Sequence, residues 1–202
     1  MTIRTMTNGS APGWDGLPNK FFKILAGPNE KDKGAPTSRP SRLAHLLAAT
    51  YREMLEQGVM SQDMRTGVTS LLFKDKGRRD NIDSYRPITV LTTLYKILSR
   101  AMAFHLGEVI HYLVDNAQSA FQKQKRTSDV SRLVQNIIDH CETEGLAGFI
   151  FFCDQHKAYD RVSWDFMQRV LSTMNLPDEF SCLTELLYSE SETRMKINGH
   201  IG

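Results

Sequence analysis

A short apolar run that ends on an acid restricts the fold more than any other feature of the sequence. Residues 149 to 153 read FIFFC, follow Gly148 and stop at Asp154. A run of this length between a turn-forming residue and a charged one is typical of a buried strand. A buried strand needs partner strands beside it and helices over its face. We therefore predict a strand from Gly148 to Asp154 in a fold that contains both helices and strands.

Apolar residues at helical spacing occur on both sides of this predicted strand. Ser41 and Gly58 bracket the clearest helix as its start and stop signals, and Ser163 is the expected N-cap of a later one. VTSLLF at 68–73 is a second strand candidate, and TRMKINGHIG predicts a hairpin that turns at Asn198-Gly199. The mixture predicts an α+β class that is mostly helical with a few antiparallel strands. Further helices are predicted at about 19–25, 92–113, 130–141, 164–171 and 178–188.

Composition leaves the choice of partner open but restricts the compartment. The chain has 202 residues, of which 41% are hydrophobic, and its formal net charge of +2 neither demands nor excludes nucleic acid. Its three cysteines are odd in number and share no metal-ligand spacing, which favours a reducing compartment. No apolar run approaches the roughly 20 residues of a membrane span, and MTIRTMTNGS lacks the apolar core of a signal peptide. We therefore expect an intracellular protein that has no membrane partner.

Asp154 has a structural interpretation and a chemical one. An acid that follows an apolar strand commonly caps the next turn, and this would explain Asp154 by itself. Tyr159 and Asp160 lie close behind it, and two basic segments, at 74–86 and 121–129, precede it. Phosphoryl transfer with paired magnesium ions needs carboxylate oxygens at such a strand end, together with lysines and arginines that hold phosphates. The same spacing of acids would also suit an unrelated magnesium-dependent phosphatase, so the acids alone leave the reaction open.

The string around Asp154 resembles the first palm motif of the reverse transcriptases of non-LTR retrotransposons, the LINE class. FCDQHKAYDRVSWDF at 152–166 is similar to the family's L-D-x-x-K-A-F/Y-D-x-V-x-W. Four further blocks resemble family segments and occur in family order, which a phosphatase would not explain. They are SAPGWDGLPNKFF at 10–22, FKDKGRRDNIDSYRPITVLTTLYKILSR at 73–100, NAQSAFQKQKRTSD at 116–129 and LYSESETRMKINGHIG at 187–202.

The resemblance implies a metal and sugar site around the first palm motif. Asp154 matches the catalytic aspartate that binds metal, and the backbone carbonyl of Gln155 is expected to help hold a second ion. Two Mg²⁺ ions are the expected cofactors of the intact enzyme. Tyr159 matches the aromatic steric gate, which crowds a ribose 2′-hydroxyl and so favours deoxynucleotides. Asp160 is expected to have a structural role at the start of a helix.

The resemblance also assigns basic residues to phosphates. Arg86, in the string SYRPI, matches the fingers arginine that contacts the incoming triphosphate, and either Lys74 or Lys76 matches the lysine on its γ-phosphate. Lys125, with Arg126 beside it, falls where the family's G-R-S motif has its arginine, which implies a template contact. The implied partners are an RNA template, a DNA primer and deoxynucleoside triphosphates.

The resemblance divides the chain into two parts of a right-hand polymerase. Residues 1–147 would form an N-terminal extension and the fingers, with an exposed linker at about 26–40, and residues 148–202 would form a partial palm. Gln124-Lys125 replaces the family's Gly-Arg, so the turn and the template role there depart from the pattern. We expect the sequence to stop before the family's Q-G segment and before its F/Y-x-D-D hairpin, which supplies the remaining carboxylates.

The function implied by these blocks is that of a fragment of an RNA-directed DNA polymerase from a LINE-type retrotransposon. The intact enzyme would catalyse two-metal nucleotidyl transfer in the cytoplasm and nucleus, and the fragment alone is expected to be inactive because its carboxylate set is incomplete. The alternative is a non-catalytic remnant that keeps a basic, nucleic-acid-binding surface.

Overall fold

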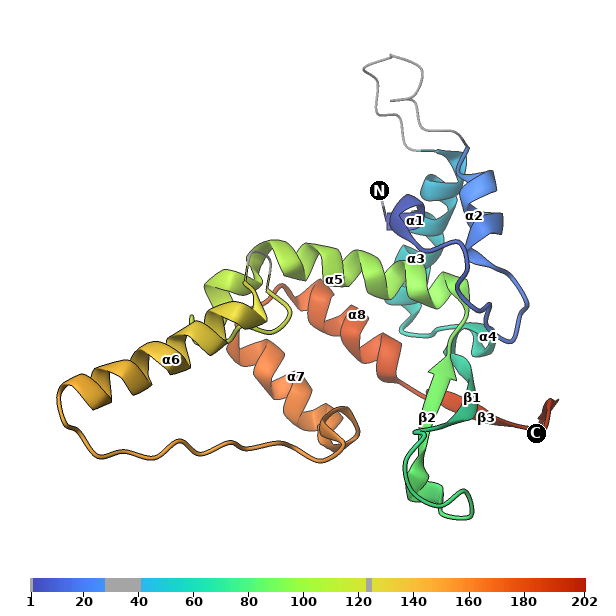
Figure 1. Ribbon diagram of the computed structural model, residues 1–202. Helices are drawn as coiled ribbons and strands as arrows, with labels where there is room; N and C mark the ends of the chain where they lie inside the picture. The colour runs from blue at the N-terminus through green and yellow to red at the C-terminus, as the bar shows by residue number, and fades with distance from the viewer. Residues whose placement is uncertain (1, 28–40, 123–124) are drawn as a thin grey trace. The chain divides into compact units, whose positions relative to one another are not determined.

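The computed structural model describes residues 2–27, 41–122 and 125–202. The described residues fall into two compact units, which are treated separately below. Figure 1 labels the helices and strands of the chain. Unit 1 combines Met1–Met102 with Leu176–Gly202, and unit 2 comprises Ala103–Asn175. Most of the predicted linker at 26–40 lies outside the described residues. The predicted division into fingers and palm at residue 148 concerns the parts of a polymerase hand and stays a prediction.

The helices of unit 1 begin and end where local signals place them. Helix α3 (Arg42–Gln57) starts at Ser41, whose hydroxyl accepts the Ala44 N–H at 3.2 Å, and it stops at Gly58, whose φ of 67° few other residues adopt easily. These two ends confirm the predicted start and stop. The other helices of the unit are α1 (Thr2–Thr5), α2 (Asn19–Leu25), α4 (Gln62–Arg65), the first part of α5 (Thr93–Leu113) and α8 (Asp178–Tyr188).

A mixed four-stranded sheet completes unit 1, with the strand order β2-β1-β3-β4. Its strands are β1 (Thr66–Phe73), β2 (Tyr85–Val90), β3 (Glu192–Ile197) and β4 (His200–Ile201). The pairs β1–β2 and β3–β4 are antiparallel hairpins, and the second turns at Asn198-Gly199 as predicted. The central pair β1–β3 is parallel, so the sheet combines antiparallel pairs of the predicted kind with one parallel pair that was not predicted. Parallel strands require a crossover connection, and here the long segment between β2 and β3 supplies it.

Strand β2 was not predicted, because its sequence contains a proline and follows a basic, turn-rich segment. Pro87 cannot donate a hydrogen bond to a neighbouring strand, but β2 lies at the edge of the sheet, where one row of backbone groups has no strand partner. The predicted α+β class, mostly helical with a few strands, is otherwise confirmed.

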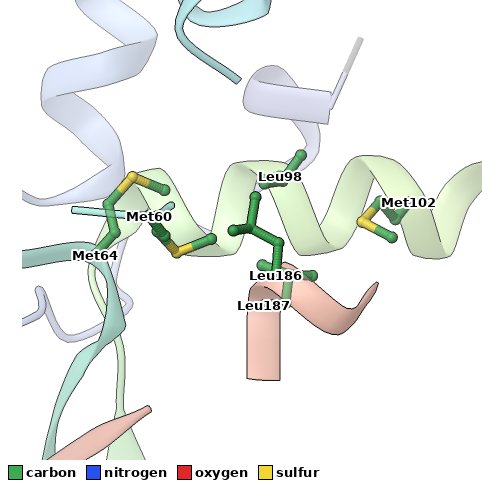
Figure 2. Close-up of a cluster of buried hydrophobic side chains, with 6 residues drawn as sticks. All are labelled: Met60, Met64, Leu98, Met102, Leu186 and Leu187. Atoms are coloured by element: carbon green, nitrogen blue, oxygen red, sulfur yellow. The ribbon is translucent and has the colours of Figure 1, made fainter. Parts of the chain in front are cut away.

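Two hydrophobic clusters form the core of unit 1. Figure 2 shows the first, in which side chains of α5 and α8 meet Met60 and Met64; its other buried members are Leu98, Met102, Leu186 and Leu187. The second cluster joins the N-terminal segment to α3 and α5 through Met6, Phe22, Leu47 and Ile97. Tyr51 and Leu94 pack against both clusters, so the two behave as one continuous core.

Two tyrosine hydroxyls tie the core helices to one another. Tyr51 of α3 donates to the carbonyl of Leu94 in α5 at 2.9 Å, and Tyr95 of α5 donates to the carbonyl of Leu187 in α8 at 3.0 Å. Burial raises the pKa of the Tyr51 phenol, and burial together with the neighbouring Tyr188 raises the pKa of Tyr95 to about 12. Both hydroxyls are therefore held in the protonated form that the hydrogen bonds require.

Unit 2 contains the end of α5, helix α6 (Thr127–Thr143), a 3-10 turn at Ala158–Arg161 and helix α7 (Trp164–Thr173). None of its described residues is fully buried. Ser163 caps α7 as predicted, because its hydroxyl accepts the Phe166 N–H at 3.2 Å. Across the described parts of the whole chain, no helix is both long and apolar enough to cross a membrane.

The predicted buried strand from Gly148 to Asp154 is absent from the structure. This segment has no regular secondary structure, and the side chains of Phe149, Phe151 and Phe152 are 94%, 81% and 82% exposed. A strand requires hydrogen bonds to a neighbouring strand, and none of the described strands pairs with this segment. The prediction was therefore wrong for this chain, although the apolar sequence has the composition of a strand.

Candidate functional site

Asp154 and Gln155 lie at the end of the exposed apolar segment. Both residues are solvent-exposed, and neither belongs to a helix or strand. The carboxylate of Asp154 and the carbonyl of Gln155 are hard oxygen donors, which suit Mg²⁺, an ion that proteins often hold through only one or two carboxylates with water and substrate phosphates. Among the residues that the structure describes, no group of three or more His, Cys, Asp or Glu side chains gathers as a metal site. The oxygen donors of Asp154 and Gln155 are therefore of the type that Mg²⁺ prefers. They would supply part of its coordination shell.

A left-handed residue and a 3-10 turn position Tyr159 after this acid. Lys157 has a φ of 52°, and the N–H of Asp160 donates to the Lys157 carbonyl at 3.0 Å. The reversal of the chain places Tyr159 in the turn with its ring 82% exposed. Asp160 lies in the first turn of this short helix, where an acid suits the helix dipole. The roles predicted for these side chains remain predictions.

The β1–β2 hairpin carries the predicted phosphate-binding residues, and its loop is internally hydrogen-bonded. The Lys74 N–H donates to the Ser84 carbonyl at 2.9 Å, and the Lys74 ammonium donates to the Asp83 carbonyl at 2.7 Å. Gly77 has a φ of 88°, and a Cβ there would lie 2.6 Å from the Ser84 hydroxyl oxygen. Both lysines are exposed, and the ammonium of Lys74 helps to close the loop through its hydrogen bond to Asp83.

Two neighbouring arginines of this loop have different surroundings. Arg78 forms a two-point ion pair with Asp80, at 3.0 Å and 2.6 Å, and this contact holds the pKa of the Asp80 carboxyl below its usual range. Arg79 instead lies over the ring of Phe73, 5.0 Å from the ring centroid, while its carbonyl accepts the Tyr85 hydroxyl at 2.9 Å. No pattern in the sequence indicated this stacked arginine, because the contact depends on the fold of the loop.

Arg86 lies in β2 opposite Leu72 of β1 and is exposed. Residues opposite one another in a sheet share a face, and successive residues of a strand point to opposite faces. Arg86 and Leu72 therefore share one face of the hairpin, whereas the pair Phe73 and Tyr85 lies on the other. It follows that Arg79, which stacks on Phe73, and Arg86 are associated with opposite faces of the hairpin.

Lys125 and Arg126 lie just before helix α6 in unit 2. The Lys125 ammonium donates to the carbonyls of Asn116 and Gln118, at 2.5 Å and 3.1 Å. The Arg126 N–H donates to the Asp129 carboxylate at 2.9 Å, which caps the helix, and the Arg126 side chain is exposed. The Lys125 ammonium therefore links the segment before α6 to the carbonyls of Asn116 and Gln118, in addition to its predicted contact with the template. Gln124, at the departure from the family's Gly-Arg, falls outside the described residues.

The predicted site residues divide between the two units. Lys74, Lys76 and Arg86 belong to unit 1, where one hairpin brings them together. Asp154, Gln155, Tyr159, Lys125 and Arg126 belong to unit 2.

Comparisons with known proteins identify the family. The sequence model of the family described as "Reverse transcriptase (RNA-dependent DNA polymerase)" matches residues 74–201, which is more than half of the chain. This match includes every residue to which the resemblance assigned a role in the site.

Relatives of known name extend the similarity toward the N-terminus. The chain is 26% identical over 199 residues, 97% of its length, to the "Transposon TX1 uncharacterized 149 kDa protein" of Xenopus laevis. It is 25% identical over 155 residues, 75% of its length, to the "RNA-directed DNA polymerase from mobile element jockey" of Drosophila funebris. It is 23% identical over 175 residues, 87% of its length, to the "Retrovirus-related Pol polyprotein from type-1 retrotransposable element R2" of Nasonia vitripennis.

These alignments cover only a small part of each relative. The chain spans 14%, 15% and 16% of the lengths of the three proteins, respectively. The matched family and the kinds of mobile element that the relatives' names give agree with the resemblance drawn from the five sequence blocks. The chain belongs to the reverse transcriptase family, within its non-LTR, LINE-type branch.

Proposed function

We propose that this chain forms part of an RNA-directed DNA polymerase, to which it contributes a metal-binding aspartate, a sugar-selecting tyrosine and a phosphate-binding hairpin. The observation that carries the proposal is the family match across residues 74–201, which contains Asp154, Tyr159 and Arg86 in one alignment. The proposed partners are an RNA template, a DNA primer and deoxynucleoside triphosphates, and the proposed places of action are the cytoplasm and nucleus.

Polymerases of this family use divalent metal ions, and we assign Mg²⁺ to Asp154 and the Gln155 carbonyl. Mg²⁺ held by Asp154 and the Gln155 carbonyl would act as a Lewis acid and would stabilise the negative charge that develops during nucleotidyl transfer. Asp154 is solvent-exposed, so that a ligand can reach it. The reaction that these residues would serve joins a primer 3′-oxygen to the α-phosphate of a deoxynucleotide and releases pyrophosphate.

Tyr159 and the hairpin bases would orient the nucleotide. The ring of Tyr159 is 82% exposed and free to lie against a ribose, where it would crowd a 2′-hydroxyl. Arg86 would form a forked contact with phosphate oxygens, for which a guanidinium is suited. Of the two candidate lysines, Lys76 is the better candidate for the γ-phosphate, since the ammonium of Lys74 already donates to the Asp83 carbonyl.

A chimera tests the proposal. This chain would replace the matching segment of the jockey polymerase, and incorporation of deoxynucleotides opposite an RNA template would be measured with Mg²⁺, with Ca²⁺ and with a chelator. The proposal predicts incorporation that requires Mg²⁺. A folded chimera that binds primer-template but incorporates nothing, beside an active jockey parent, would contradict it.

The steric role of Tyr159 provides the second arm of this test. We expect Tyr159→Ala to raise incorporation of ribonucleotides relative to deoxynucleotides by about ten- to a hundredfold, the scale of a steric exclusion. Trp164→Ala, which removes an exposed aromatic ring five residues further on, is the matched control and should leave the sugar preference unchanged. An unchanged sugar preference in Tyr159→Ala would refute the assignment.

A further inference from the structure

One face of the sheet in unit 1 carries an excess of positive charge that the sequence blocks did not reveal. The pairing register places Leu72 beside Arg86, and Val68 beside Arg194. Ser70 lies beside Ile88 on one side and beside Lys196 on the other. Because paired residues share a face, Arg86, Arg194 and Lys196 all project from the same side of the sheet. We call this side the basic face.

Apolar side chains lie among the three bases. Leu72 is 57% exposed, Ile88 is 46% exposed and Ile201, which pairs with Lys196, is 50% exposed. One row of the basic face therefore crosses all four strands in the order Ile88, Ser70, Lys196, Ile201. Glu192 is the one acid on this face among the strand residues that the structure describes, and its carboxylate accepts the Gln62 amide at 3.4 Å.

An aromatic ring borders the basic face at Arg194. The Arg194 guanidinium lies 5.3 Å from the centroid of the Trp14 ring, and the indole N–H donates to the Asp63 carbonyl at 3.1 Å. Gly13 holds this loop against the chain after β2, since a Cβ on Gly13 would lie 2.5 Å from the Thr92 Cα. The stacked guanidinium keeps its N–H edge available for an anion.

The opposite face of the sheet differs in character. It carries the pair Phe73 and Tyr85, and the hydroxyl of the buried Thr69 is bonded to those of Thr89 and Thr193. These three threonine hydroxyls are therefore used within the sheet, and Arg79 lies on this side of the sheet, over the ring of Phe73.

We propose that the basic face binds a single strand of nucleic acid, with Arg194 and Lys196 on its phosphates and the apolar side chains against its sugars and bases. Charge complementarity selects this occupant, because the basic face carries three basic side chains and only one acidic side chain among its strand residues. Exposed apolar side chains lie between the basic ones. This combination suits a nucleic acid strand, which has a negatively charged backbone and apolar base rings. The inference rests on the proposed function, since a template-directed polymerase must hold a single strand. Its test requires only binding, so that the two proposals can fail separately.

The test measures binding of the 202-residue chain to a fluorescent oligouridine of about 20 nucleotides, and to the matching oligothymidine, by anisotropy at several salt concentrations. The double variant Arg194→Ala/Lys196→Ala should weaken binding on the order of tenfold at about 50 mM salt. It should also reduce the salt slope by about 0.7 for each phosphate that the variant no longer neutralises. Arg86 is left intact because the proposed function assigns it to the nucleotide. A similar loss of affinity for the two probes in the double variant indicates contacts with phosphates. A loss of affinity for the RNA probe alone indicates contacts with 2′-hydroxyls as well. Both outcomes support the proposal.

Arg79→Ala is the matched control, because it removes a positive charge from the other face of the same sheet. It should change the affinity less than about twofold, as expected for a base outside the contact. Lys196→Gln removes one charge at an exposed strand position, and its thermal melting should match that of the parent. Weaker binding by this variant would therefore come from the lost contact and not from unfolding. If Arg79→Ala and the double variant lost the same amount of affinity for the oligonucleotide, the proposal would be overturned, because binding would then depend on net charge alone. Unchanged binding in the double variant, or a dimer that this variant dissociates, would also overturn it.

Discussion

At the scale of single residues, Lys74 and Lys76 show how neighbouring bases acquire different roles. Both lie in the same basic loop, but the Lys74 ammonium donates to the Asp83 carbonyl at 2.7 Å. We expect Lys74→Met to destabilise the folded chain by about 0.5–1.5 kcal/mol, the usual contribution of a hydrogen bond, and Lys76→Met to leave its stability unchanged. Urea unfolding of the two variants measures the difference. Equal stabilities would show that the Lys74 contact does not hold the loop.

The buried tyrosines predict a loss of stability at alkaline pH. The folded-state pKa of Tyr95 is raised to about 12 from an ordinary value of 10, so its stabilising effect is present below pH 10 and is lost as the pH rises toward 12. Tyr51 acts in the same direction. The variant Tyr95→Phe should therefore lose less stability than the parent between pH 10 and about 12. Chemical denaturation across this range tests the effect, and parallel curves for parent and variant would contradict it.

Local signals among residues could be read from the sequence, whereas contacts across the fold could not. Ser41, Gly58 and the Asn198-Gly199 turn act through the backbone of their own segment, and each was predicted. The Lys74–Asp83 contact and the ring of Phe73 beneath Arg79 depend on how a loop folds back, and no spacing of residue types reveals them. The alternation of Arg194 and Lys196 was visible, but its meaning depended on the parallel pairing of β3 with β1.

At the scale of elements, helix α3 offers a direct test of local control. Its N-cap hydroxyl accepts the Ala44 N–H, so Ser41→Ala should reduce the free energy of unfolding by about 1 kcal/mol. Ser41→Asp, which keeps an acceptor, is the matched control and should restore the parent's stability. Thermal melts of the three proteins measure these changes. If Ser41→Ala melts with the parent, the cap makes no contribution to stability.

Strands were harder to predict than helices in this chain for a physical reason. A helix forms its hydrogen bonds within its own segment, and α2 and α8 occur at the residues predicted for them. A strand needs a distant partner, and the apolar segment 149–153 remains without one among the described strands although its composition is that of a strand. Conversely, β2 forms despite Pro87, because β1 is available beside it and the edge position tolerates the missing donor.

At the scale of the whole molecule, burial is concentrated in unit 1. All fully buried described residues lie there, and α6 and α7 of unit 2 have none. We therefore expect the backbone amides of α6 and α7 to exchange with solvent faster than those of α3 and α8, since local opening costs less where few side chains are buried. Hydrogen exchange followed by mass spectrometry measures this difference. Slower exchange in α6 and α7 would contradict the distribution of stability described here.

Substitutions in the core of unit 1 should confirm where the stability lies. Leu186→Ala would leave a cavity among Met60, Leu98 and Leu187 and should cost about 2–5 kcal/mol, whereas Leu133→Ala, on the exposed face of α6, should cost far less. Denaturant unfolding of both variants provides the comparison. If Leu186→Ala and Leu133→Ala lost similar amounts of unfolding free energy, a second and equally important core would have to lie in unit 2.

The role of Asp154 is the central claim and has the most direct test. In the chimera with the jockey polymerase, Asp154→Asn should reduce Mg²⁺-dependent incorporation on the order of a thousandfold or more, because it removes the charge of the proposed metal ligand. Asp160→Asn makes the same chemical change six residues away, in the 3-10 turn, and should retain most of the activity. Incorporation by Asp154→Asn at the rate of Asp160→Asn would contradict the assignment.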